Sequence, residues 1–415
     1  MWIVLHAVNI LYINHYAGAP RYGMEYRPYY LAREWQQLGH HVRIVAASYS
    51  HLRLKAPALA GAWTEEDVDG VPYVWLKTPA YDGNGARRVL NMFAFVGALF
   101  RRANRLTKYR KPDVVITSST YLLDNLPARF MARRCGAKLV FEVRDLWPMS
   151  PIELGNMSPR HPFIQLLRWA EGFSYRSADR VVSVLPNARK HMEEHGLTPG
   201  KFTYVPNGIA VAEWESGNAA LPESHSARLH HLRESGCFIL GYAGGHAVSN
   251  ALGFLLEAAR LLAGQSVAFV LVGSGAEKEN LMRTARALEL WNVTFLPPVP
   301  RRAVPALLRA MDACYIGWQD KPIYRFGVSP NKIFDYMMAG KPVIHSVNAS
   351  NDVVAESGCG VTVRPEDAEA IAKAVLRLAS MSNSERDALG GRGRDFVLKH
   401  HDYRVLARRF LEALS

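Results

Sequence analysis

"PDVVITSSTYLLDNLPARFMARRCGAKLVFEVRD", residues 112–145, is the stretch that decides the fold class. Two short apolar runs, "PDVVITSS" and "KLVFEVRD", enclose the helical pattern "LPARFMARRCG". Strand, helix and strand in this order are typical of a parallel β-sheet covered by helices. The same rhythm holds in "HVRIVAAS" before this stretch and in "RVVSVLP" after it, so the sequence predicts an α/β fold.

The rhythm pauses once and then restarts, which predicts two similar α/β units. The pause, residues 206–235, is polar and contains Gly, Ser and Pro, so we interpret it as a linker. Residues 1–205 form the N-terminal unit, and residues 236–400 form the C-terminal unit with the runs "CFILGYAGG", "VAFVLVGSG", "DACYIGW" and "KPVIHSV". The last helix, residues 403–415, can pack on either unit.

Length and composition are those of an ordinary globular protein, since the chain has 415 residues, 49% hydrophobic and 21% charged. No run of 18 apolar residues is present, and the start "MWIVLHAVNILYINHY" lacks a basic region and a cleavage site, so it is interpreted as a strand. The expected location is therefore the cytoplasm. The four cysteines are far apart without CxxC spacing, which favours reduced core thiols.

The net charge of +13 indicates an acidic partner such as nucleic acid, anionic lipid or a phosphorylated substrate. Between Asp82 and Asp113 there is no acidic residue, and basic residues flank the apolar run "VLNMFAFVGALF". Residues 85–111 therefore resemble a basic amphipathic helix on an anionic membrane. A solvated basic helix that packs on its own domain is the equally open alternative.

Each unit has one glycine-containing turn after its first strand, where an open parallel sheet binds its ligand. The first contains Gly18 and Gly23, and the second contains Gly244 and Gly245 before a helix that starts near Asn250. Neither is a GxGxxG or GK[ST] motif, so by themselves they predict only close backbone turns.

"SPNKIFDYMMAGKPVI", residues 329–344, predicts an anion site. Ser329 reads as the N-cap and Pro330 as the first helical residue, which puts Lys332 among free N–H groups at the positive end of the helix dipole. A cation there is unfavourable unless an anion such as a diphosphate joins it. Asp335 lies on the same face and can accept hydrogen bonds from a ribose diol. The alternative is a surface ion pair between Lys332 and Asp335.

Three further positions in the N-terminal unit are candidates. Asp145, in "DLWP" after a strand, can receive a proton or orient an acceptor hydroxyl, or it is a turn cap. His15 is either at the rim of the sheet or a core histidine. Asp67 and Asp69 have the spacing of a metal-binding pair, but they precede Gly70 and read better as a hairpin turn, so no metal site is predicted.

Taken together, these stretches resemble the retaining family 4 glycosyltransferases of the GT-B fold, especially bacterial enzymes that build O-antigen and capsule repeat units, among them transferases of N-acetylated deoxyhexosamines. The resemblance covers nearly the whole chain. It rests on the order and spacing of "GMEYRPYYLAREWQQLGHHVRIVAAS", "RDLWP", "VPNGI", "GYAGGH", "LVGSGAEKENL", "VTFLPPVPRRAVPALLRAMDACYIG" and "SPNKIFDYMMAGKPVI".

The resemblance implies two Rossmann-like domains whose parallel sheets face each other across a cleft. It implies transfer, with retention of anomeric configuration, of a sugar from a UDP-sugar held by the C-terminal domain. The acceptor, held by the N-terminal domain, is implied to be an undecaprenyl-diphosphate-linked saccharide at the inner face of the cytoplasmic membrane. Neither a metal nor another cofactor is implied, and no nucleic acid is expected as a partner.

The resemblance also assigns residues. It implies catalytic roles for His15, Glu25, Asp145 and Lys332. Gly18 and Gly23 belong to the loop over the reaction centre. It implies that the nucleotide sugar is bound by Gly244, Gly245, His246, Pro298, Arg301, Ser329, Pro330, Asn331, Lys332 and Asp335.

The chain departs from the family pattern at three points. Gly327 stands where the E-x7-E motif has its first carboxylate, Ala210 ends "VPNGIA", and the second glycine turn lacks a basic residue. Lys332 is therefore expected to neutralise the diphosphate alone, and a donor sugar with fewer hydroxyls, such as an N-acetylated 6-deoxyhexose, is favoured. A nucleotide-sugar epimerase of the same fold is the alternative, and a basic nucleic-acid-binding protein is a weaker one because no reading motif is present.

Overall fold

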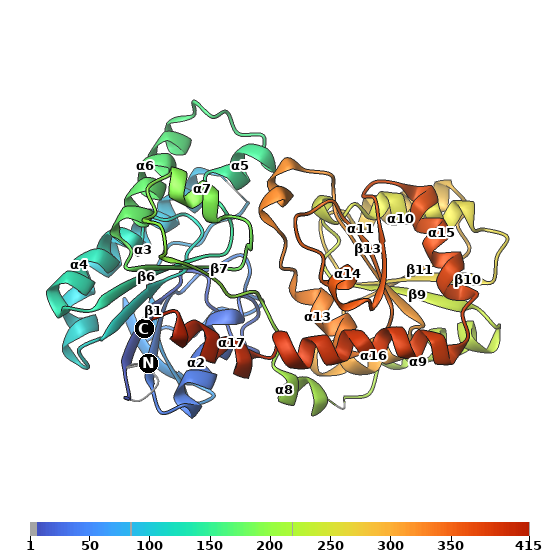
Figure 1. The fold of residues 1–415 in the computed structure, drawn as a ribbon, viewed down its shortest axis with the longest axis horizontal. Coiled ribbons are helices and arrows are strands. Elements are labelled where there is room, and N and C mark those ends of the chain that lie inside the picture. The colour runs from blue at the N-terminus through green and yellow to red at the C-terminus, as the bar shows by residue number, and fades with distance from the viewer. Residues whose placement is uncertain (1–5, 84, 218, 415) are drawn as a thin grey trace. The chain divides into compact units, whose positions relative to one another are not determined.

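The structure, a computed structural model, describes residues 6–83, 85–217 and 219–414. The chain forms two compact α/β units (Figure 1). The first unit comprises residues 1–207 and 403–415, and the second comprises residues 208–402. The predicted class, two domains built on parallel sheets, is confirmed.

The first unit is built on an eight-stranded sheet of order β3-β4-β2-β1-β5-β6-β7-β8. All neighbouring strands are parallel except β3 and β4, which form a hairpin. The strands are β1 (Asn9–Ile13), β2 (His41–Ala47), β3 (Trp63–Val68), β4 (Val71–Leu76), β5 (Val114–Thr117), β6 (Lys138–Val143), β7 (Arg180–Ser183) and β8 (Phe202–Tyr204).

Helices cover this sheet as the alternating pattern predicts. They are α2 (Arg27–Gln37), α3 (Ala86–Lys108), α4 (Asn125–Cys135), α5 (Met149–Glu153), α6 (Pro162–Ser177), α7 (Arg189–Glu194) and α17 (Tyr403–Glu412). The unit β5–α4–β6 confirms the reading of residues 112–145, and α4 ends at Gly136, whose φ of 66° is in the left-handed region. The first strand starts only at Asn9, and residues 1–5 of the predicted strand lie outside the described residues.

The C-terminal helix α17 packs on α2 in the first unit (Figure 1). The indole Nε1 of Trp35 donates to the carbonyl of Ala407 at 3.0 Å, and its ring centroid lies 5.1 Å from that of Phe410. The expected linker, residues 206–235, instead contains α8 (Val211–Glu215) and α9 (Glu223–Glu234). Their buried Trp214, Leu229 and Leu232 belong to the core of the second unit.

The second unit is built on a six-stranded parallel sheet of order β11-β10-β9-β12-β13-β14. Its strands are β9 (Phe238–Ala243), β10 (Val267–Val272), β11 (Val293–Leu296), β12 (Ala313–Gly317), β13 (Val343–Ser346) and β14 (Gly360–Val363). All of β10, "VAFVLV", is buried because helices cover both faces of the sheet. The strand order reverses between β9 and β12, and a ligand binds beyond the carboxyl ends of strands at such a point.

Seven helices and three short 3-10 turns lie between or after these strands in the described part of the chain. The helices are α10 (Leu252–Leu261), α11 (Lys278–Ala287), α12 (Val304–Arg309), α13 (Asn331–Met338), α14 (Val353–Ser357), α15 (Ala368–Ala379) and α16 (Asn383–His400). The 3-10 turns are η1 (Val248–Asn250), η2 (Arg301–Ala303) and η3 (Pro322–Phe326). No helix within the described ranges is long and apolar enough to cross a membrane. All four cysteines are free.

Candidate functional site

Helix α13 starts one residue later than the sequence predicted. Pro330, with φ −75° and ψ 131°, is the N-cap, and Asn331 is the first helical residue, so the assignment of Ser329 as N-cap and Pro330 as first helical residue is wrong. Asn351 accepts from the N–H of Val328 at 2.7 Å and donates to its carbonyl at 3.0 Å, which holds the preceding loop extended. No side chain in the described part of the chain caps α13, so its first N–H groups keep their positive potential.

Lys332 is held against the turn after β9 by two neutral side chains. Its Nζ donates to Oδ1 of Asn250 at 2.6 Å and to the hydroxyl of Tyr242 at 3.0 Å. The same two side chains donate to the carbonyl of Gly245, at 2.9 and 2.6 Å. A Cβ on Gly244 would lie 3.3 Å from Cε of Lys332, so glycine allows this close approach. Burial lowers the pKa of Lys332 to about 8.

Asp335 does not pair with Lys332, so the surface ion pair considered from the sequence is wrong. Its Oδ2 accepts from Nη1 of Arg301 at 2.7 Å, which brings together two residues that the sequence predicted for the same site. The carboxylate is buried, and among the described residues its Oδ1 has no hydrogen-bond partner. Asp335 can therefore accept one more hydrogen bond while it stays paired with Arg301. Pro298 is exposed in the loop before η2.

A second glycine turn, after β10, completes the backbone around Lys332. A Cβ on Gly273 would lie 2.0 Å from the carbonyl oxygen of Gly244, and one on Gly275 would lie 2.4 Å from that of His246. Both have φ near 150°, where other residues are strained. The sequence reasoning did not single out these two glycines, although "GSG" directly after a buried strand was a signal for them.

His246 lies in the turn after β9 and is fully buried. Burial first, and then the positive charges of Lys278 and Lys332, lower its pKa to about 4. The ring is therefore neutral at pH 7, and neither nitrogen has a hydrogen-bond partner within the described ranges. Lys278 is turned to the backbone, where its Nζ donates to the carbonyls of Gly273 at 2.8 Å and Leu296 at 3.1 Å.

Gly327, in place of the first motif carboxylate, has a backbone that other residues rarely adopt. Its φ is 107° and its ψ is 170°, a combination that is essentially restricted to glycine. The missing carboxylate is thus accompanied by a loop conformation that a glutamate would strain.

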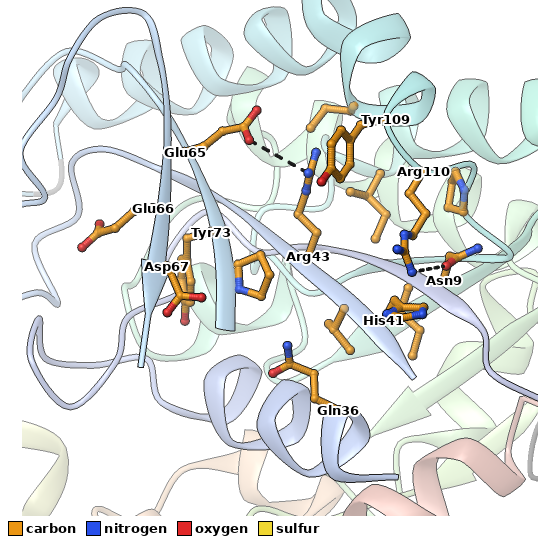
Figure 2. A pocket seen from close by; sticks show the side chains of 16 residues that line it. Asn9, Gln36, His41, Arg43, Glu65, Glu66, Asp67, Tyr73, Tyr109 and Arg110 are labelled. Atoms are coloured by element: carbon orange, nitrogen blue, oxygen red, sulfur yellow. Dashed lines mark hydrogen bonds and ion pairs between the residues drawn. The ribbon is translucent and has the colours of Figure 1, made fainter. Parts of the chain in front are cut away.

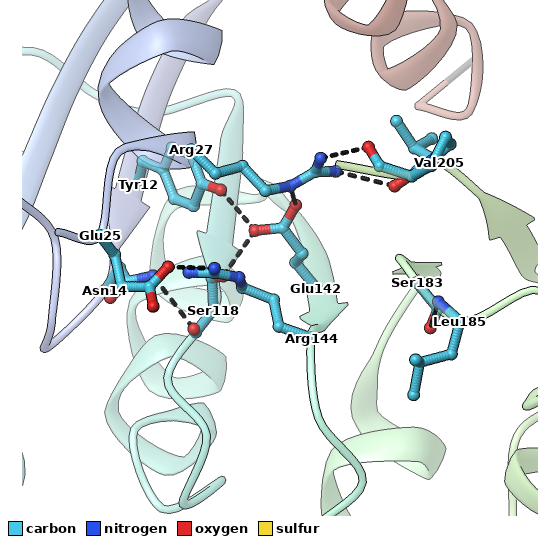
Figure 3. Close-up of polar contacts among 11 residues, drawn as sticks. Tyr12, Asn14, Glu25, Arg27, Ser118, Glu142, Arg144, Ser183, Leu185 and Val205 are labelled. Atoms are coloured by element: carbon cyan, nitrogen blue, oxygen red, sulfur yellow. Dashed lines mark hydrogen bonds and ion pairs between the residues drawn. The ribbon is translucent and has the colours of Figure 1, made fainter. Parts of the chain in front are cut away.

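In the first unit, a buried ion pair lies at the carboxyl ends of β1, β5 and β6 (Figure 3). Oε1 of Glu142 accepts from Nε of Arg27 at 2.8 Å, and its Oε2 accepts from the hydroxyls of Tyr12 and Ser118, each at 2.5 Å. Burial raises the pKa of Glu142, but Arg27 and the hydrogen bonds hold it below its usual value. The sequence pattern does not reveal the pair of Arg27 and Glu142, because Glu142 lies inside an apolar strand.

Arg144 links the predicted loop of Gly18 and Gly23 to the end of β6. Its guanidinium forms an ion pair with Glu25 (Figure 3). The loop itself is tight, since a Cβ on Gly18 would lie 2.0 Å from the carbonyl oxygen of Gly23. Asp145 follows and is exposed. Loss of hydration beside the protein raises the pKa of Asp145. The positive charge of Arg144 opposes this effect, and the negative charge of Glu25 adds to it.

Of the other N-terminal candidates, His15 lies just after β1, where its N–H donates to Oγ of Ser119 at 3.0 Å. It is fully buried with its Nδ1 2.9 Å from the hydroxyl of Tyr121, and burial lowers its pKa well below the usual value. This burial favours the core alternative, although Nε2 has no hydrogen-bond partner among the described residues. Asp67 accepts from the N–H of Gly70 at 2.7 Å, and Asp69 pairs with Arg21 at 2.7 Å, as expected for a hairpin turn.

A cavity of about 410 Å³ opens at the beginning of β1 and β2 in the first unit (Figure 2). Arg43 crosses it, 4.4 Å from the ring centroid of Tyr109 and 4.0 Å from Glu65. Of the predicted side chains, only Asp67 lines this cavity. Because parallel sheets bind ligands at the opposite ends of their strands, this cavity is not the candidate site.

Two doubly wound units, each with a glycine turn at the end of its first strand, are the architecture of the GT-B fold. Residues 22–208 match the glycosyl transferase 4-like domain, and residues 237–381 match the glycosyl transferases group 1 domain. The chain belongs to the glycosyltransferase family composed of these two domains.

Similar proteins span almost the same length. WcaI of Escherichia coli (strain K12), a proposed colanic acid biosynthesis glycosyl transferase, is 24% identical over 380 residues, 89% of this chain and 90% of that protein. WbjE of Pseudomonas aeruginosa, a proposed glycosyltransferase, is 21% identical over 79% of this chain and 78% of that protein.

Solved structures share the fold, and two of them illustrate the likeness. Sucrose-phosphate synthase from Thermosynechococcus elongatus has a TM-score of 0.73 and 17% identity, covering 98% of this chain and 100% of that one. HepE of Anabaena, solved with UDP and glucose, has a TM-score of 0.68 and 15% identity, covering 98% and 99%.

Replacing Gly327 should destabilise the second unit. Gly327→Ala is expected to lower the free energy of unfolding by about 1–3 kcal/mol, because alanine is strained at this backbone conformation. Urea titration measures the change. The control, Gly391→Ala in α16, meets open space and should stabilise by about 0.5–1 kcal/mol. Equal stability of Gly327→Ala and the parent would show that the loop tolerates a side chain.

Proposed function

We propose that the protein transfers a sugar, with retention of anomeric configuration, from a UDP-sugar to a hydroxyl of an undecaprenyl-diphosphate-linked saccharide in bacterial surface polysaccharide synthesis. The observation that carries the proposal is Lys332, a partly desolvated ammonium beside the uncapped start of α13. The complex of HepE with UDP and glucose and the name of WcaI support the donor and the pathway class.

The donor diphosphate is bound where positive potential is already concentrated. Lys332 uses two of its three protons on Asn250 and Tyr242, which leaves one for a phosphate oxygen. The N–H groups of Asn331 and Lys332 supply the helix end. Gly244 and Gly273 bring backbone close to the same point. No second basic side chain of this turn is required, in keeping with the sequence "GGHAVSN".

The ribose is bound one turn further along α13. Oδ1 of Asp335 accepts a hydrogen bond from a ribose hydroxyl, and Oδ2 remains paired with Arg301. The exposed loop at Pro298 forms the wall for the base. Gly327 supplies no carboxylate for the hydroxyls of the sugar, which favours a donor with fewer of them, such as an N-acetylated 6-deoxyhexose.

Charge stabilisation drives the transfer. As the bond to the sugar breaks, negative charge develops on the leaving diphosphate, and Lys332 and the helix end stabilise it. The same diphosphate helps to deprotonate the acceptor hydroxyl on its own face of the sugar, which gives retention. In the first unit, Glu25, held by Arg144, and the exposed Asp145 orient the acceptor.

Helix α3 provides a surface that binds the membrane in which the lipid-linked acceptor is anchored. Met92, Phe95 and Leu99 are buried, but Leu90, Phe93 and Phe100 are 60%, 46% and 44% exposed. Their spacing of three and seven residues puts them on one face of the helix. The neighbouring basic residues on this helix are Arg87, Arg88, Arg101, Arg102, Arg105 and Lys108. We assign this face to the anionic cytoplasmic side of the membrane.

Binding of UDP should depend on the charge of Lys332. Lys332→Ala is expected to lose a charge-assisted contact of about 1.5–3 kcal/mol, roughly 10- to 150-fold in affinity at pH 7. An anion favours the protonated lysine, so affinity is complete below the free pKa of about 8 and falls as pH rises through it, by up to about tenfold per unit. Calorimetry in EDTA measures both effects.

Two matched variants separate the roles in this site. Lys332→Arg keeps its charge above pH 8, so it should remove the fall of affinity with pH. Asp335→Asn should weaken UDP but spare inorganic diphosphate, since only the ribose contacts that side chain. If Lys332→Ala binds UDP as the parent does, the diphosphate site lies elsewhere. An absolute need for Mg²⁺ or Mn²⁺ would contradict the metal-independent site.

The protein should sediment with anionic liposomes and be released by high salt, because each basic residue near such a surface contributes about 1 kcal/mol. Reversing the charge of Arg101, Arg102 and Arg105 should reduce binding at least tenfold. The control reverses three exposed basic residues in the second unit, Arg283, Arg286 and Lys373. Equal loss in both triple variants would refute a specific surface on α3, and no sedimentation of the parent would leave α3 as an ordinary solvated helix.

A further inference from the structure

Three side chains that can ligate a metal converge between α6 and α7 in the first unit. Glu171 of α6 and His191 of α7 are buried, with 1% and 9% of their surface exposed, and His195, at the end of α7, is exposed. One ligand atom of each lies within 4.8 Å of the others. A buried carboxylate and two imidazoles at a spacing of four residues are a donor set that suits Zn²⁺.

Hydrogen bonds hold both histidines in place beside Glu171. Nδ1 of His195 lies 2.8 Å from the backbone carbonyl of His191, so this nitrogen carries the proton and the lone pair of Nε2 remains for a metal. The two rings lie 4.1 Å apart between centroids. Nε2 of His191 lies 2.8 Å from Oε1 of Glu171, which also accepts from the hydroxyl of Tyr175 at 3.4 Å. The backbone and Tyr175 thus act as outer partners of the three ligands.

We infer that Glu171, His191 and His195 form a Zn²⁺ site with a fourth position open to water. Ligand atoms around a tetrahedral zinc ion lie about 3.3 Å apart, so a rotation of the exposed His195 ring completes the set. Binding replaces the hydrogen bond between Nε2 of His191 and Glu171. The neutral ring of His191 then gives the lone pair of Nε2 to the ion and carries its one proton on Nδ1, and any second proton held by the pair leaves to solvent. The ion then ties α6 to α7 and stabilises the first unit. A hydrogen bond between Glu171 and His191 alone would not involve His195.

One nearby charge opposes the ion and limits its affinity. The side chain of Arg176 lies beside Gly172 and Gly196, the residues that follow Glu171 and His195 in the chain. A Cβ on either glycine would lie 2.9 Å from an atom of Arg176. The guanidinium repels a cation, so the site is expected to bind Zn²⁺ in the micromolar range rather than as tightly as a closed structural site.

The test is titration of the EDTA-stripped and desalted full chain with Zn²⁺, followed by calorimetry and thermal unfolding. One ion per chain with a Kd in the micromolar range is expected, with a rise in Tm of about 5 °C at a hundredfold excess over Kd. His195→Ala, at an exposed position, should lose at least tenfold in affinity and the rise in Tm. The control is His230→Ala, which removes an exposed histidine that pairs with Glu234 at 3.0 Å on α9; it should change neither.

The outcome does not depend on the donor site. The rise in Tm caused by UDP is measured separately in EDTA, and His195→Ala should leave it unchanged. Equal zinc affinity of His195→Ala and the parent would overturn the inference, as would the absence of an ion bound in the micromolar range. Substitution of Zn²⁺ by Co²⁺ gives a second readout: the visible absorption of a tetrahedral cobalt site should appear in the parent and the His230→Ala variant and be lost in His195→Ala.

Discussion

A lysine ammonium at the positive end of a helix is the constraint on which the second unit depends. Lys332 lies where the dipole of α13 opposes its charge and where burial lowers its pKa to about 8. Tyr242 and Asn250 hold it there and also fix the carbonyl of Gly245. The lysine, the turn after β9 and the start of α13 therefore form one rigid group. In the function that we propose, a bound diphosphate relieves this conflict of charges.

The first unit depends on a different interaction, the buried pair of Arg27 and Glu142. Arg27 also donates to the carbonyls of Val205 and Pro206, at 3.0 and 2.5 Å. The pair thus joins the start of α2, the end of β6 and the segment that follows β8 (Figure 3). Removing one partner of such a pair leaves an uncompensated buried charge, which costs about 3–5 kcal/mol. The buried pair therefore helps to fix the positions of Arg144 and Glu25, which lie beside it.

The sequence predicted the fold well because apolar runs and helical patterns record burial directly. Residues 112–145 form the predicted strand, helix and strand, and the two parallel sheets follow from the same pattern. The sequence also brought Lys332 and Asp335 to one helix. It could not show that Asp335 pairs with Arg301, since that contact joins segments 34 residues apart. It could not reveal Glu142 as a structural anchor either, because its partner Arg27 lies 115 residues away in the chain.

Local signals failed where distant contacts set the backbone. Ser329 has the composition of an N-cap, but Asn351, 22 residues further on, holds the loop so that the helix begins only at Asn331. The surroundings of the His15 and Glu171 side chains were likewise not predictable from neighbouring residues in the sequence. Burial of His15 by Phe95 and Tyr121, and convergence of Glu171 with residues of α7, both follow from packing across the unit.

A crystal structure of the protein with UDP can show whether Lys332 and the start of α13 bind the diphosphate. We expect a β-phosphate oxygen within hydrogen-bond distance of Nζ of Lys332 and of the N–H groups at the start of α13. We also expect a ribose hydroxyl to contact Oδ1 of Asp335, with Arg301 still paired to Oδ2. A diphosphate bound away from Lys332, or a ribose turned away from Asp335, would contradict the proposed donor site.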